Sequence, residues 1–267
     1  NASGAPTIQL ASGLQGVHSL TTSDPLKLTG GLLSVGTIQN TANITLAGGT
    51  ISGATINESA GATVMATSTE SRLTGVTING NLDLSADNAA VHVNGGLTLN
   101  GTAIMSANND RLAFDGPSPQ TLGGNATILF QGTNGTRYLA IESGAALTIG
   151  PNVLIHGQRG IIGQAVFNGG PHSLVNQGTI TADAADPGNG IQISDQVALV
   201  NAGTIQALNG GGVTLRRLGS NSGTISAAAA SSVSGGGSGG SGDANSGDPN
   251  AKICLLYTSD AADDLTR

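Results

Sequence analysis

The chain is poor in cysteine, aromatic residues and charged residues. Its 267 residues include one cysteine, no tryptophan and only 2% aromatic residues. The single cysteine, Cys254, excludes an internal disulfide framework and a thiolate metal site. Charged residues make up only 9% of the chain, and its net charge is −7, so the sequence disfavours nucleic acid, which requires clustered Lys and Arg. No apolar run approaches the roughly 20 residues of a membrane span, and we expect no insertion into a membrane.

Glycine and small aliphatic side chains are abundant instead. The chain has 43 glycines, and 38% of its residues are hydrophobic. Disordered chains are poor in aliphatic residues and high in net charge, so a folded core is expected here. That core must be built from Ile, Leu, Val and Ala rather than from aromatic rings. The glycine and β-branched content opposes helix.

One short motif, Asn-x-Gly-Thr-Ile, occurs three times, at residues 176–180, 201–205 and 221–225. In each copy the Ile and the Ala two residues later point to one face of a strand, while the residues between them point to the other. Gly permits a corner, and Asn suits a tight turn because it tolerates left-handed backbone. Each copy therefore predicts a short strand with an aliphatic inner face and a polar outer face.

A strand of that size buries almost no surface alone, whereas stacked copies bury a continuous column. The predicted fold is all-β: a single-chain parallel β-helix, also called a β-solenoid. We expect the Ile residues to stack in one column and the Asn residues to form a ladder at the adjacent corner, with neighbours about 4.8 Å apart. A β-sandwich is the main rival fold, but it would need longer strands and hairpin turns. The residues concerned are Ile180, Ile205 and Ile225, and Asn176, Asn201 and Asn221.

The repeats also carry a family resemblance. The segments LVNQGTITA, LVNAGTIQA and NSGTISA resemble the coils of bacterial filamentous-haemagglutinin-like and autotransporter-like exoproteins, most strongly over 174–227 and more loosely over 26–173. The resemblance implies a right-handed, pectin-lyase-like β-helix with a structural or adhesive role outside the bacterial cell or on its surface. Implied partners are host or environmental glycans or surface proteins, and secretion domains would flank this stretch.

The composition divides the chain into four parts. Residues 1–25 are expected to be an irregular segment or an incomplete coil, and residues 26–230 the β-helix, with roughly ten coils of about 20 residues. Residues 231–251 form a Gly/Ser-rich stretch that is typical of a flexible linker. Residues 252–267 resemble a translated transposon end left by sequencing-library preparation. We interpret them as a non-native tail, and we expect residues 231–267 to pack little against the rod.

The main alternative function is a carbohydrate-active β-helix enzyme, a polysaccharide lyase or hydrolase. Such enzymes act on acidic sugars with carboxylates and basic groups gathered on one outer sheet, where they serve as acid and base. Because acidic and basic residues are sparse, we expect no catalytic site and no cofactor. If the chain is an enzyme, the candidates are His156, Arg159, Asp115, Arg137 and Glu142.

Two further possibilities remain open. Loop carboxylates at Asp183, Asp186 and Asp195 would suit calcium, which prefers oxygen ligands, but a polar loop explains them as well and no metal is expected. The second is an ice-binding or self-assembling surface lined by threonine. A column of Thr179, Thr204 and Thr224 would favour such a surface.

Overall fold

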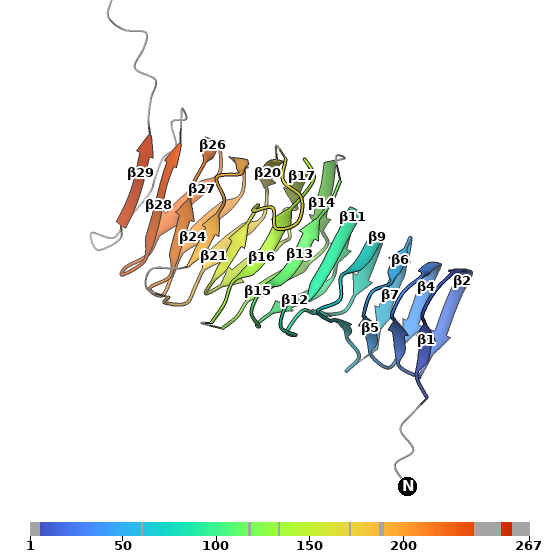
Figure 1. Ribbon diagram of the computed structural model, residues 1–267. Helices are drawn as coiled ribbons and strands as arrows, with labels where there is room; N and C mark the ends of the chain where they lie inside the picture. Colours follow the sequence, from blue (N-terminus) through green and yellow to red (C-terminus); the bar gives the residue numbers. More distant parts are fainter. Residues whose placement is uncertain are drawn as a thin grey trace, which may run out of the picture.

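A computed structural model describes residues 6–59, 61–116, 119–132, 134–170, 172–186, 190–237 and 252–257, with side chains up to residue 235. Over these residues the chain forms strands and turns only, and no helix there could cross a membrane. The strands stack in parallel into an elongated rod, with β1 and β2 at one end and β28 and β29 at the other (Figure 1). The predicted all-β parallel β-solenoid of about ten coils is confirmed.

Each coil contributes strands to three columns, which we call the first, second and third face. The first face is an eleven-stranded parallel sheet. Its strands are β1 (Ile8–Leu10), β3 (Leu26–Leu28), β5 (Ile44–Leu46), β8 (Val64–Ala66), β10 (Leu82–Asp83), β12 (Gly101–Met105), β15 (Ala126–Phe130), β18 (Leu154–Gly157), β21 (Thr179–Ala182), β24 (Thr204–Ala207) and β27 (Thr224–Ala227).

Four long strands turn from the second face into the third without a break: β2 (Leu14–Thr22), β4 (Leu32–Asn40), β9 (Ser71–Asn79) and β11 (Ala90–Leu99). The second face also contains β6 (Thr50–Ser52), β13 (Asp110–Phe114), β16 (Arg137–Ile141), β19 (Gly160–Ile162), β22 (Ile191–Ile193), β25 (Gly212–Leu215), β28 (Ser232–Gly237) and β29 (Lys252–Tyr257). The third face is completed by β7 (Thr55–Glu58), β14 (Pro119–Gly123), β17 (Ala146–Ile149), β20 (His172–Asn176), β23 (Val197–Asn201) and β26 (Leu218–Asn221).

The repeat motif occupies the register that the sequence predicts. Ile180 pairs with Ile205, and Ile205 pairs with Ile225. All three side chains are at most 1% exposed, so they belong to the core. Because these strands are hydrogen-bonded neighbours, successive Ile residues lie one strand spacing apart, about 4.8 Å. The predicted aliphatic column is confirmed.

The asparagine ladder is also present. The side-chain amide of Asn176 donates to Oδ1 of Asn201 at 2.8 Å, and that of Asn201 donates to Oδ1 of Asn221 at 2.7 Å. Asn176 and Asn201 are completely buried. Each amide lies close to the carbonyl of the Gly two residues later, at 3.3–3.4 Å. The ladder thus satisfies polar groups that the corner takes out of water.

Strand pairing extends beyond the predicted limits of the β-helix. β1 and β2 pair in register with β3 and β4, so the stack begins at Ile8. Of the two alternatives predicted for residues 1–25, an irregular segment or an incomplete coil, these strands favour a coil. At the other end β28 pairs with β25, which carries the stack past residue 230 into the predicted linker.

The predicted tail also contributes a strand. The backbone of β29 pairs with β28 over six residue pairs, so the expectation that residues 252–257 remain apart from the rod is not met. Residues 238–251 and 258–267 lie outside the described residues. The non-native origin of 252–267 remains a prediction.

Candidate functional site

The middle of the rod holds wider coils than its N-terminal part. Eighteen residues separate Leu26 from its partner Ile44, whereas 27 residues separate Ile128 from its partner Ile155. The same middle region contains most of the buried charged or titratable side chains, and these are where chemistry would reside. They are His92, Asp110, Asp115, Arg137, Glu142 and His172.

A group of charged side chains, which we call the His92 cluster, lies on the outside of the second face. Nδ1 of His92 lies 2.6 Å from Oδ2 of Asp115, and Nη1 of Arg72 lies 3.2 Å from the same oxygen. On the other side of the imidazole, Oε2 of Glu70 lies 3.4 Å from Nε2. Arg72 and His92 are register partners on neighbouring coils, so the stack itself brings them together.

An aromatic ring covers this cluster. Phe167 comes from the segment between β19 and β20, and its ring centroid lies 4.5 Å from that of His92. The guanidinium carbon of Arg111 lies 5.4 Å from the Phe167 centroid, within the range of a cation–π interaction. Two coils and a loop therefore close over the imidazole.

Glu142 fixes the covering segment. Its carboxylate accepts hydrogen bonds from the backbone amides of Val166 at 2.7 Å, Phe167 at 3.1 Å and Asn168 at 2.7 Å. Glu142 is fully buried, and three donors to one carboxylate offset the cost of its burial. This predicted candidate is an anchor for the loop over the His92 cluster.

A paired imidazole and carboxylate can relay a proton, but this pair lacks an open side. His92 is 3% exposed, while Glu70 and Arg72 are 55% and 54% exposed. Nε2 of His92 and Oδ1 of Asp115 are buried without a hydrogen-bond partner. A substrate therefore meets the outer charges of Arg72 and Glu70, and reaches the imidazole only if Phe167 moves.

Arg137 is one of the residues that the sequence suggested for an enzyme site, but it lies inside the rod rather than on an outer sheet. It is 1% exposed and donates to the carbonyls of Ser106 at 2.8 Å, Gly132 at 3.0 Å and Gly135 at 3.2 Å. Burial lowers the pKa of Arg137, although the charge of Asp110 opposes the shift. These bonds hold a corner together and leave the guanidinium unavailable to a substrate.

Asp110 is the partner of Arg137 on the neighbouring strand. Burial raises the pKa of its carboxyl to about 6, against the opposing hydrogen bond from the Ala107 amide and the charge of Arg137. Burial also lowers the pKa of His172, whose ring nitrogens have no hydrogen-bond partner, and raises the pKa of Glu58. These shifts follow chiefly from burial within the stack.

The other two candidates form separate ion pairs with the next coil. Nδ1 of His156 lies 2.7 Å from Oδ2 of Asp183. Arg159 forms a two-pronged pair with Asp186, with Nε at 2.7 Å and Nη2 at 3.1 Å from its oxygens, and this hydrogen bonding raises the pKa of Arg159. Both basic side chains are thus already paired with a carboxylate of the next coil.

These pairs also account for two of the calcium candidates, because Asp183 and Asp186 face basic groups. Asp195 accepts a hydrogen bond at 3.4 Å from the neighbouring Ser194. Across the described ranges, no group of three or more His, Cys, Asp or Glu side chains could hold a metal ion. The five enzyme candidates do not converge: only Asp115 and Glu142 belong to the surroundings of His92.

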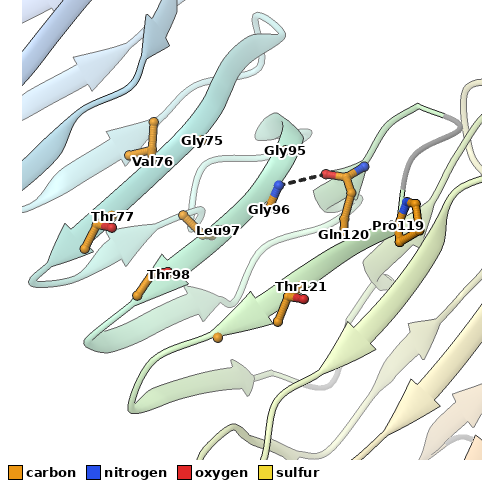
Figure 2. Close-up of a pocket in the computed structure, with 11 residues that line it drawn as sticks. Gly75, Val76, Thr77, Gly95, Gly96, Leu97, Thr98, Pro119, Gln120 and Thr121 are labelled. Atoms are coloured by element: carbon orange, nitrogen blue, oxygen red, sulfur yellow. Dashed lines mark hydrogen bonds between the residues drawn. The ribbon is translucent and has the colours of Figure 1, made fainter.

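A groove of about 360 Å³ lies where the long strands turn from the second face into the third (Figure 2). Its floor includes Gly75, Gly95 and Gly96, with φ of 57°, 73° and 85°, a left-handed conformation that favours glycine. The register shifts between Asn94 and Leu97, which marks a β-bulge at this turn. The groove therefore lies at this bulge, and the residues of the bulge line it.

The groove adjoins the His92 cluster through one buried side chain. Gln120 donates from Nε2 to the carbonyl of Asp115 and accepts at Oε1 from the Gly96 amide, at 3.1 Å. Thr98 and Thr121 line the same groove and are exposed, and Thr77 is half-buried. Within the described residues the three threonine hydroxyls have no hydrogen-bond partner. They are available to a ligand.

Thr77 and Thr98 belong to a longer row along the third face, which we call the hydroxyl row. Its five members are register partners on successive coils: Ser19, Thr37, Thr55, Thr77 and Thr98. Beside it runs a row of amides, in which Asn79 donates to Asn57 at 2.6 Å and Asn100 donates to Asn79 at 2.7 Å. The two rows make a regular polar surface.

On the first face, the predicted column of Thr179, Thr204 and Thr224 is confirmed.

Comparisons with protein-family models, with curated proteins and with solved structures gave no match. The fold is that of a β-solenoid protein, and its outer surfaces carry the features that bear on function.

Proposed function

We propose that this chain is a structural and adhesive passenger segment of a secreted or surface-displayed bacterial exoprotein. The observation that carries this proposal is the uninterrupted stack from β1 to β28, with one continuous aliphatic core. The eleven strands of the first face, spaced about 4.8 Å apart, give a rod roughly 50 Å long. A rod of this kind holds side chains at a fixed distance from its point of attachment.

The outer surface favours binding over chemistry. His156 and Arg159 are paired with carboxylates, and the His92 imidazole is covered by Phe167. By contrast, the hydroxyls of the hydroxyl row have no hydrogen-bond partner among the residues that the structure describes, and the row follows the rod for five coils. Glycans or surface proteins are the partners that such a surface would contact.

Binding of the purified chain to arrayed glycans and to immobilised bacterial and host surface proteins tests this proposal. We expect saturable binding to at least one surface. The matched control is the Ile205→Asp variant, which places a charge in the core and removes the folded surface. A chain that binds none of these surfaces any better than the control contradicts the adhesive proposal.

A second candidate function, cleavage of acidic polysaccharides, is favoured by one observation. Arg72 and Glu70 lie exposed beside the His92–Asp115 pair, which is the mixture of charges that a uronate polymer would need. Incubation with pectin, pectate and alginate tests it: a lyase leaves unsaturated ends and a hydrolase leaves new reducing ends. We expect neither product. Product that appears with the parent chain and disappears in the His92→Gln or the Arg159→Ala variant would establish the enzyme instead.

A further inference from the structure

The charge of the outer faces differs sharply between neighbouring columns. The second face carries Arg72, His92, Arg111 and Asp115 at outward positions or directly beside them. The groove and the hydroxyl row on the third face contain no Asp, Glu, Lys, Arg or His. A ligand that lies on the groove and the hydroxyl row must therefore be recognised without ionic contacts to their side chains.

We propose that the third face binds a neutral, linear polysaccharide that lies along the rod over the hydroxyl row, with the glycine groove as its deepest subsite. This inference rests on the adhesive function proposed above and names the ligand class. The chain of sugars would cross β4, β7, β9 and β11 and end against β14.

The first argument is the chemistry of the lining. A hydroxyl both donates and accepts hydrogen bonds, as do the hydroxyls of a sugar. Thr77, Thr98 and Thr121 have no partner among the described residues, so binding would cost no internal bond. An anionic sugar would lose hydration here without meeting a cation, so a uronate is disfavoured.

The second argument is the shape of the groove. A Cβ atom added at Gly75 would meet nothing within 4 Å, so the space above this backbone is open. One added at Gly96 would lie 2.9 Å from the carbonyl of Thr121, because the next coil packs closely there. Glycine in a strand commonly marks a place where a ligand or another backbone approaches. At Gly75 the open space would admit a ligand, whereas at Gly96 the backbone of the next coil approaches closely.

The third argument is spacing. Successive members of the hydroxyl row are one coil apart, about 4.8 Å, and this is close to the length of one sugar unit in an extended chain. Each sugar would then meet one hydroxyl and one amide of the neighbouring row. No aromatic side chain lines the groove, so each contact is weak and affinity must come from many contacts along the chain.

The experiment compares the parent chain with the double variant Thr77→Val/Thr98→Val. Valine keeps the shape and the strand propensity of threonine but removes both hydroxyls. The matched control is Thr179→Val/Thr204→Val, which makes the same change on the first face. Binding to neutral polymers (mannan, xylan, β-glucan) and to acidic ones (pectate, alginate) is measured by isothermal titration, with circular dichroism to confirm folding.

We expect the parent chain and the control to bind a neutral polymer equally, and the groove variant to bind about tenfold more weakly, since two hydrogen bonds are lost. Short oligosaccharides of the same sugar should compete and the monosaccharide should not, because the affinity is spread over several coils.

Other outcomes separate this inference from the adhesive proposal. If the groove variant binds as tightly as the parent, the site is wrong while adhesion stands. If only acidic polymers bind, the ligand class is wrong. If the parent chain instead inhibits ice recrystallisation and the groove variant does not, the hydroxyl row orders water rather than sugar. Absence of binding to every glycan and every surface protein contradicts both proposals.

Discussion

At the scale of single residues, Asn201 shows how much one side chain can do in a stack. Its amide donates to Asn221, its Oδ1 accepts from Asn176, and it is completely buried. An alanine here would remove the acceptor that the buried amide of Asn176 uses at 2.8 Å. It would also remove the donor to Oδ1 of Asn221, which is half-buried.

We therefore expect Asn201→Ala to lower the free energy of unfolding by roughly 1–3 kcal/mol, because two hydrogen bonds of the ladder are lost. Urea denaturation followed by circular dichroism measures the change. Asn94→Ala is the control, because Asn94 is exposed and has no side-chain hydrogen bond among the described residues. A loss no larger than that of the control would show that the ladder is not stabilising.

Asp110 provides a pH dependence with a definite sign. Burial raises the pKa of its carboxyl from 3.8 to about 6, so the folded state binds a proton that the unfolded state releases. Its stabilising contribution is complete below pH 4 and is lost as the pH rises through 6, by at most about 3 kcal/mol. Burial of His172 acts in the opposite direction, since its lowered pKa costs stability as the pH falls below 6.5.

The Asp110→Asn variant isolates this effect, because asparagine keeps an acceptor for the Ala107 amide and does not titrate. We expect the stability of the parent chain relative to the variant to fall between pH 4 and pH 7, while the contribution of His172 cancels. Urea denaturation of both proteins at four pH values in this range measures the difference. Parallel profiles would show that Asp110 titrates normally.

At the scale of structural elements, the segment between β19 and β20 depends on Glu142. Glutamine at this position keeps the size of the side chain but loses the charge that three backbone amides share. We expect Glu142→Gln to raise the hydrogen exchange rates of the Val166, Phe167 and Asn168 amides by about tenfold, since charged acceptors bind roughly twice as strongly as neutral ones. Exchange rates equal to those of Glu70→Gln, at an exposed position, would contradict this role.

Individual strands also show which parts of the fold could be predicted from the sequence and which could not. The strands β21, β24 and β27 were predictable because Ile180, Ile205 and Ile225 sit in a repeated motif with short connections. The strand β2 was missed because it carries no copy of that motif, and its role depends on pairing with β4.

The His92 cluster shows the limit most clearly. His92 and Phe167 are 75 residues apart, and only the widths of the intervening coils bring their rings to 4.5 Å. Measured between partners on the first face, these coils span 21 to 27 residues, and no sequence repeat specifies their widths. Asp115 was identifiable as an isolated carboxylate, but its partners His92 and Arg72 were not. The hydroxyl row left a weak signal in GTIQ, GVTIN and GLTLN, which became informative only when their register was known.

At the scale of the whole molecule, the stack should tolerate the removal of one complete coil. Deleting residues 202–221 joins Asn201 to Ser222 and places Ile225 on Ile180, because those Ile residues share a column. Coils contact mainly their neighbours, so the shortened chain should fold into a rod about 4.8 Å shorter.

Circular dichroism and small-angle scattering test this prediction. The control is a deletion of half a coil, residues 207–216, which brings strands of different faces together and should prevent folding of the C-terminal coils. If the whole-coil deletion is as damaging as the half-coil deletion, the coils are not independent units.

The direction of the hydrogen bonds in the stack has a mechanical consequence. Because every strand pairs only with the coils before and after it, these bonds lie along the length of the rod. Tension applied between the two ends would break the hydrogen bonds of one coil before those of the next, so the coils would detach one at a time. Each coil of 18–27 residues that detaches would release roughly 60–90 Å of extended chain, far more than the spacing it occupied. A tether built this way lengthens in steps under a sudden pull and keeps its remaining coils, and the surface they carry, intact.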